Sequence, residues 1–126
     1  PSLKQLSPNF SILSEEQVAA GNIPDISDGT YWAVDPLDGT KEFIKLNGEF
    51  TVNIALVKEG LCTFGAVFAP ALNELYVGIP ERGAFCCRHQ KNFDQPLDYL
   101  LQFSDRLPVE DSSDMLFRVV ASRCIR

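Results

Sequence analysis

One stretch, YWAVDPLDGTKEFIKLNGEFT at positions 31–51, places the strongest constraint on how this chain folds. Its apolar start predicts a strand that leads to Asp35, and Pro36 follows directly. Because proline lacks an N–H and has a fixed φ, we expect the regular strand to stop there. Asp38 comes three positions after Asp35, so the sequence places two carboxylates at the end of one strand.

The residues after these carboxylates predict a turn into a short helix. Gly39 permits a left-handed backbone, and Thr40 is a suitable N-cap for a helix over positions 40–44. Carboxylate and carbonyl oxygens bind Mg²⁺ while the ion keeps several waters, and a helix N-terminus offers N–H donors to a phosphate. Asp-Pro and Asp-Gly are also common turn dipeptides, so a plain surface turn stays open as the alternative.

A second acidic segment precedes this turn. Residues 10–13, Phe-Ser-Ile-Leu, predict a short strand. Ser14 is a candidate N-cap for a helix that begins with Glu15 and Glu16. Acidic residues in a first helical turn stabilise the helix dipole, so this structural role competes with any metal-binding role of Glu15.

From Glu49 onward the sequence is typical of β-structure. Strands are predicted at positions 50–57, 61–69, 74–79 and 83–87, separated by short turns. Such turns between successive strands predict an antiparallel meander. We also expect a short helix over Asp98–Phe103 and a further strand over Leu116–Ala121, which makes the fold class α+β, an antiparallel meander packed with helices.

Composition argues against several functional classes. The formal net charge is −6, and no basic stripe offers a nucleic-acid surface. No apolar run approaches the length of a transmembrane helix. The only histidine, His89, lies in a polar run, which argues against a Ser–His or Cys–His hydrolase.

The chain has four cysteines, at positions 62, 86, 87 and 124. Their spacing matches no zinc pattern, and the adjacent Cys86 and Cys87 make a poor disulfide. We therefore expect buried, reduced thiols in a cytoplasmic protein. Cys62 and Phe64 are expected to pack as core residues.

Glu15-Glu16 together with WAVDPLDGTKEFI resembles the inositol monophosphatase superfamily of lithium-sensitive, Mg²⁺-dependent phosphatases. The fingerprint of that superfamily is an acidic pair on a helix upstream of D-P-[LI]-D-G-T, and here Glu15 lies twenty positions before Asp35. The strings ILSEE, KEFI and NGEFTVNIALV are most similar to the CysQ-type 3'(2'),5'-bisphosphate nucleotidases, whereas inositol monophosphatases usually have Thr-Asn-Phe after D-G-T. The resemblance implies part of a layered αβαβα, sugar-phosphatase-like fold.

The resemblance also implies metal ligands, for two or three Mg²⁺ ions per complete site. Glu15 would bind one ion and help hold the attacking water. Asp35 would bridge two ions, and the backbone carbonyl of Leu37 would complete the first site. Asp38 would bind the second ion.

The same resemblance implies a phosphate site beside these ligands. Gly39 and Thr40 would offer backbone N–H groups to the substrate phosphate, next to Asp38. The hydroxyl group of Thr40 would help to orient the attacking water.

The implied activity is hydrolysis of adenosine 3',5'-bisphosphate to AMP and phosphate, in the context of sulfate assimilation. An inositol or sugar-phosphate monophosphatase and a non-catalytic phosphate- or nucleotide-binding remnant remain the alternatives. The family has an acidic N-terminal helical region and a downstream W-D-x-x-A motif, which residues 1–126 do not contain. We therefore expect a partial catalytic domain, and the sequence gives no indication of its oligomeric state.

One departure from the family pattern bears on the substrate. Bisphosphate nucleotidases often have Ser-Arg-Ser-His where this chain has Ser-Arg-Cys-Ile at positions 122–125. A missing hydrogen-bond partner is worth about 1–3 kcal/mol. We therefore expect a nucleotide preference that is weaker than the family pattern suggests.

Overall fold

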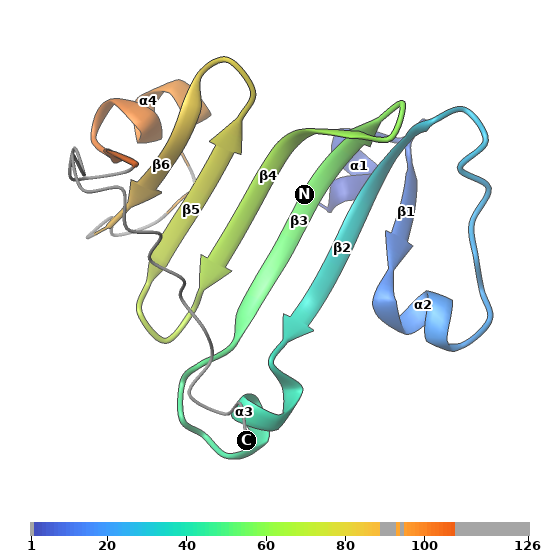
Figure 1. Cartoon of the computed structure of the whole chain (residues 1–126), viewed down its shortest axis with the longest axis horizontal. Helices are drawn as coiled ribbons and strands as arrows, with labels where there is room; N and C mark the ends of the chain where they lie inside the picture. The colour runs from blue at the N-terminus through green and yellow to red at the C-terminus, as the bar shows by residue number, and fades with distance from the viewer. Residues whose placement is uncertain (1, 89–92, 94, 108–126) are drawn as a thin grey trace, which may run out of the picture.

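The computed structural model describes residues 2–88, 93 and 95–107. Within them, seven strands form one sheet, flanked by four short helices (Figure 1). The strands are β1 (Ser11–Ser14), β2 (Thr30–Asp38), β3 (Thr51–Lys58), β4 (Leu61–Ala69), β5 (Glu74–Ile79), β6 (Gly83–Cys87) and β7 (Asp105–Leu107). The helices are α1 (Leu3–Leu6), α2 (Glu15–Ala19), α3 (Thr40–Ile44) and α4 (Leu97–Gln102).

The strands lie in the sheet in the order in which they occur in the sequence. Each pair from β2 to β7 is antiparallel, whereas β1 runs parallel to β2. The predicted α+β class and the antiparallel meander from β3 to β6 are therefore confirmed. No helix in the described part of the chain has the length and apolar character needed to cross a membrane.

The prediction that the strand stops at Pro36 is wrong. Strand β2 continues to Asp38, and its pairing with β3 shifts register between Asp35 and Asp38. The ladder pairs Asp35↔Asn53 and Asp38↔Thr51 leave two residues of β2 opposite one residue of β3, which is a β-bulge. A bulge is where a sheet tolerates proline, because no ladder donor is required there.

Two elements were not predicted from the sequence. Helix α1 is one turn long, and β7 is a three-residue strand that pairs with β6 through Phe85↔Arg106 and its neighbours. The predicted strand at Leu116–Ala121 lies outside the described residues, as do His89 and positions 122–125.

The cysteine prediction is partly wrong. Cys86 and Cys87 are free and fully buried, as expected, but Cys62 is exposed. The β3–β4 ladder shifts register between Leu56↔Phe64 and Val57↔Cys62. Side chains alternate between the two faces along a strand. The shift breaks this alternation between Phe64 and Cys62, so the position of Phe64 does not predict that of Cys62.

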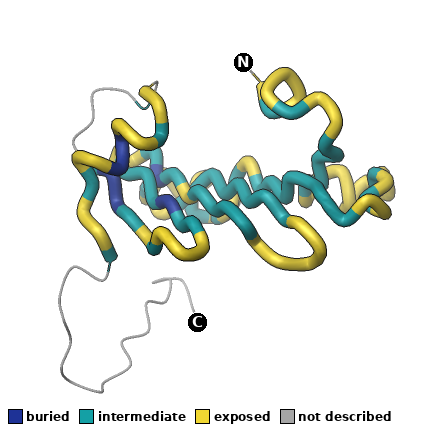
Figure 2. The backbone as a smooth tube through the Cα atoms, turned by 90° about the horizontal axis from the view of Figure 1, so that it is seen from above, coloured by how far each residue is buried: buried dark blue, intermediate teal, exposed yellow. Residues whose placement is uncertain are grey.

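The most deeply buried side chains gather at one end of the sheet (Figure 2). They come from β4, β5, β6 and α4, and they are Ala69, Val77, Cys86, Cys87, Leu100 and Leu101. At the other end, around β1, β2 and β3, side chains are half-buried or exposed. The residues predicted to form the site lie at this second, more open end.

Candidate metal and phosphate site

The parallel pairing of β1 with β2 brings the two acidic segments together. The last ladder pair is Ser14↔Val34, so Glu15 and Asp35 are the next residues of their chains and leave at the same edge of the sheet. Glu15 starts α2, whose N-cap is Ser14 as predicted, with the Ser14 hydroxyl accepting from the Gln17 N–H at 3.4 Å. The spacing of twenty positions therefore corresponds to neighbouring places in the sheet.

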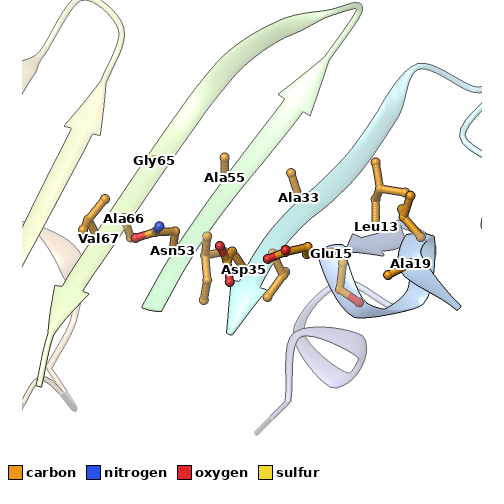
Figure 3. Close-up of a pocket in the computed structure, with 14 residues that line it drawn as sticks. Leu13, Glu15, Ala19, Ala33, Asp35, Asn53, Ala55, Gly65, Ala66 and Val67 are labelled. Atoms are coloured by element: carbon orange, nitrogen blue, oxygen red, sulfur yellow. The ribbon is translucent and has the colours of Figure 1, made fainter. Parts of the chain in front are cut away.

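Both carboxylates line a hollow of about 620 Å³ on one face of the sheet. Apolar and small residues of β1 to β4 and α2 form most of its wall: Leu13, Val18, Ala19, Ala33, Val34, Ile54, Ala55, Gly65, Ala66 and Val67. The other lining residues are Ser14, Glu15, Asp35 and Asn53. In Figure 3 the side chains of Glu15, Asp35 and Asn53 lie in one row across the hollow.

Asp35 and Asp38 lie on opposite sides of the bulge in β2 and differ in burial and in hydrogen-bond partners. Asp35 is half-buried, and its Oδ1 accepts a hydrogen bond from the Leu37 N–H at 3.1 Å. Asp38 is exposed, and its Oδ2 accepts from Nδ2 of Asn53 at 3.0 Å. Asp38 is not among the residues that line the hollow.

The turn after Asp38 differs from the prediction in one respect. Gly39, at φ +88°, is the N-cap of α3, and Thr40 is the first helical residue. The Thr40 hydroxyl makes no cap and instead donates to the Leu37 carbonyl at 3.2 Å. A carbonyl oxygen has two lone pairs, so this bond leaves the Leu37 oxygen able to accept a second partner.

Glycine is required at position 39 for two reasons. Its positive φ is one that residues with a Cβ rarely adopt. In addition, a Cβ there would lie 2.8 Å from the Glu49 carbonyl oxygen and 3.3 Å from Cα of Phe50. The backbone before β3 thus packs directly against the turn.

The donor set suits Mg²⁺ better than Zn²⁺. Within the described ranges, no three His, Cys, Asp or Glu side chains gather closely enough to hold a metal ion by themselves. Mg²⁺ does not need such a cage, because it is commonly held by one or two carboxylates, waters and substrate phosphate. Glu15 and Asp35 supply two carboxylates at one hollow, whereas Zn²⁺ sites are built mainly from cysteine and histidine.

Asn53 also lines the hollow, and the sequence analysis did not predict it as a candidate. It is the ladder partner of Asp35, and its amide donates to Asp38. Its Oδ1 is buried and has no hydrogen-bond partner among the described residues. An amide inside the apolar run Val52–Leu56 breaks the pattern of that strand, and this is the signal that points to it.

A separate polar network occupies the other end of the sheet. Arg88 donates to Glu74 at 2.9 Å and to Asp105 at 3.0 Å, and the Tyr76 hydroxyl donates to Glu74 at 2.6 Å. The hydrogen bond to Glu74, helped by burial, raises the pKa of Tyr76 to about 12. Burial likewise raises the pKa of the Cys86 thiol. These groups lie away from the hollow and serve the packing of β5, β6 and β7.

Several known proteins are similar in sequence to this chain. The sequence model of the inositol monophosphatase family matches residues 1–124. The 3'(2'),5'-bisphosphate nucleotidase CysQ of Salmonella typhimurium is 53% identical over 74 residues, which are 59% of this chain and 30% of that protein. An inositol monophosphatase of Mesembryanthemum crystallinum is 40% identical over 83 residues, 66% of this chain and 31% of that protein.

Solved structures of inositol monophosphatase family members have a similar fold. The crystal structure of CysQ from Bacteroides thetaiotaomicron, a bacterial member of the inositol monophosphatase family, superimposes with a TM-score of 0.69 at 38% identity. The match covers 87% of this chain and 41% of that one. The chain spans about 30% of the length of the curated relatives that it matches.

Proposed function

This chain belongs to the inositol monophosphatase family, and on that premise we propose that it carries the metal- and phosphate-binding part of a phosphomonoester hydrolase. The observation that carries the proposal is the convergence of Glu15 and Asp35 at one hollow, where the D-P-L-D-G-T turn begins. Enzymes of this family are Mg²⁺-dependent in general. Phosphate monoesters are among the slowest esters to hydrolyse without a catalyst, so such a site must stabilise a highly charged transition state.

We propose that four groups hold the metal ions. They are the carboxylates of Glu15, Asp35 and Asp38 and the backbone carbonyl of Leu37. The number of ions proposed is two or three in the complete protein. When bound, Mg²⁺ supplies positive charge to the phosphoryl oxygens and makes water a better nucleophile.

The turn at Gly39 would hold the phosphate. The first N–H groups of a helix have no partner within the helix, so the Gly39 and Thr40 amides are available to phosphate oxygens next to Asp38. Because Gly39 has no side chain, this backbone can pack closely against the Glu49 carbonyl. Glu15 would hold the attacking water, and Thr40 would orient it once its hydroxyl is released from the Leu37 carbonyl.

The proposed substrate is adenosine 3',5'-bisphosphate, hydrolysed to AMP and phosphate. The support is the 53% identity to a CysQ nucleotidase over 74 residues and the KEFI sequence after Thr40. A cytoplasmic role in sulfate assimilation fits this substrate, and free, buried Cys86 and Cys87 suit a reducing compartment. The 40% identity to an inositol monophosphatase keeps inositol or sugar phosphates as the second candidate.

The test is a hydrolysis assay of the complete protein. We expect activity to vanish on chelation, to return with Mg²⁺ and to fall with Li⁺, with adenosine 3',5'-bisphosphate preferred over inositol 1-phosphate and fructose 1,6-bisphosphate. Full activity in excess EDTA contradicts the metal site. Faster hydrolysis of inositol 1-phosphate selects the second candidate, and no hydrolysis of any of the three substrates selects a non-catalytic binding protein.

A further inference from the structure

Asn53 contacts both sides of the bulge in β2. Its backbone pairs with Asp35, the last residue before the register shift, and residues that face each other in a ladder project from the same face of the sheet. Its side chain donates to Asp38, the first residue of β2 that pairs again after the shift. Asn53 of β3 therefore contacts β2 both before and after the bulge.

The hydrogen bond determines which way the amide points. A carboxylate accepts hydrogen bonds and donates none when ionised, so the Asn53 atom 3.0 Å from Asp38 Oδ2 is the nitrogen. The amide oxygen is then directed elsewhere, and it is buried without a hydrogen-bond partner in the described part of the chain. Leaving a buried acceptor unpaired costs about 1–3 kcal/mol, so packing alone does not favour an asparagine at this position.

The chemistry of the donor matters as well. A lysine or arginine could also hold Asp38, but it would neutralise the carboxylate and repel a cation. The neutral amide of Asn53 fixes one oxygen of Asp38 and leaves the negative charge in place. The three ion pairs in the described residues involve Arg82 and Arg88, and none involves Asp38.

We propose that Asn53 is a positioning residue that orients the Asp38 carboxylate for Mg²⁺. This inference rests on the proposed function, because it takes Asp38 as a metal ligand. Side chains that hydrogen-bond to metal ligands set their orientation, and losing one typically reduces metal affinity or activity by about 10- to 100-fold. Asn53 would act through its hydrogen bond to Asp38.

The test measures Mg²⁺ binding by calorimetry on the complete protein without substrate. We expect Asn53→Leu, which replaces the donor by an apolar group of the same branching but larger volume, to raise the Mg²⁺ dissociation constant about 10-fold. Asn53→Ser, whose hydroxyl is too short to reach Asp38, should have the same effect without added bulk. In hydrolysis assays, both variants should need more Mg²⁺ for half-maximal activity.

The matched control is Thr63→Val, which removes a half-buried side-chain hydrogen bond to the Leu56 carbonyl on the neighbouring strand. It should leave Mg²⁺ affinity unchanged, which separates the loss of a hydrogen bond elsewhere in the sheet from the loss of the bond to Asp38. Unchanged affinity in both Asn53 variants overturns the inference, as does a loss confined to Asn53→Leu, which would reflect bulk alone. A wild-type protein that binds Mg²⁺ without hydrolysing phosphate esters refutes the proposed activity alone. A wild-type protein that binds no Mg²⁺ refutes both.

Discussion

The two ends of the sheet are built in opposite ways. At the β5–β7 end, side chains from the strands and α4 are buried, and Arg88 joins two acidic partners across the strands. At the β1–β3 end, an apolar hollow stays open, and the carboxylates of Glu15, Asp35 and Asp38 have no lysine or arginine within ion-pair distance among the described residues. Figure 2 shows the same division, with buried residues at one end alone.

The difference separates the residues that stabilise this chain from the residues of the candidate site. An acidic group that is paired with a cation within the protein is less available to an external cation. The β5–β7 end uses its acids in this way, because Glu74 and Asp105 are both held by Arg88. The β1–β3 end leaves its acids to neutral donors, namely the Leu37 N–H and the Asn53 amide. Substitutions at the β1–β3 end should therefore change kcat/KM and Mg²⁺ affinity, whereas substitutions at the β5–β7 end should change the free energy of unfolding.

The largest effect is expected at Asp35. Asp35→Asn in the complete protein should reduce kcat/KM by at least about 10³-fold, equivalent to about 4 kcal/mol. The melting temperature should not fall, because removing one of several neighbouring negative charges reduces the repulsion between them. Asp28→Asn is the control, since Asp28 makes the same type of hydrogen bond, to the Thr30 N–H, away from the hollow. Turnover of Asp35→Asn close to that of the wild type would refute the metal assignment.

A substitution at the β5–β7 end should lower stability and leave Mg²⁺ affinity unchanged. Leu100 is 4% exposed, and Leu100→Ala should reduce the free energy of unfolding by about 3 kcal/mol through lost burial and a cavity. Mg²⁺ affinity measured below the melting temperature should not change. Leu61→Ala, at a site that is 71% exposed, should change neither quantity. A drop in Mg²⁺ affinity with Leu100→Ala would mean that the two ends are coupled.

Two glycines with positive φ, Gly39 in the turn between β2 and α3 and Gly60 in the turn between β3 and β4, allow the next comparison. Gly39→Ala should cost about 2 kcal/mol or more, because it combines a positive φ with the close Glu49 carbonyl. Gly60→Ala is the matched control, since Gly60 has φ +77° and no atom within 4 Å of the added Cβ. Chemical denaturation of both variants measures the difference. Equal losses would show that φ alone explains the glycine at position 39.

The smallest effect is expected at Tyr76. Tyr76→Phe should cost about 1 kcal/mol, as for a typical hydrogen bond, and should leave hydrolysis unchanged. The pKa of Tyr76 is raised from 10.0 to about 12 by Glu74, so its contribution to stability is complete below pH 10 and is lost as the pH rises through 12. Absorbance titration should show a tyrosine that ionises near pH 12, and that step should be missing in Tyr76→Phe.

Much of the fold could be predicted because its determinants are local. The alternation of apolar residues and the short turns between strands give the bounds of β4, β5 and β6. Ser14 and the two glutamates after it give the start of α2. In contrast, β7 is three residues long and forms through its pairing with β6, a contact that local sequence does not encode.

The site was predicted unevenly for the same reason. The resemblance to a family motif predicted Glu15, Asp35 and the turn at Gly39, and the structure brings Glu15 and Asp35 to one hollow. The bulge was missed, because proline indicates a break in the ladder and does not say whether the strand resumes beyond it. Asn53 was missed because its contact with Asp38 depends on the register of β2 against β3.

The sequential order of the strands also has a consequence for how the molecule assembles. Every strand in the described residues pairs with its neighbour in the sequence, and pairings between neighbouring segments close faster than pairings between distant ones. A β-hairpin closes in about 1–10 μs, far faster than a ribosome adds residues. Glu15, Asp35 and Asp38 lie on α2 and β2, whose sheet neighbours are β1 and β3. During synthesis these elements emerge before β5, β6 and α4, which contain most of the buried core.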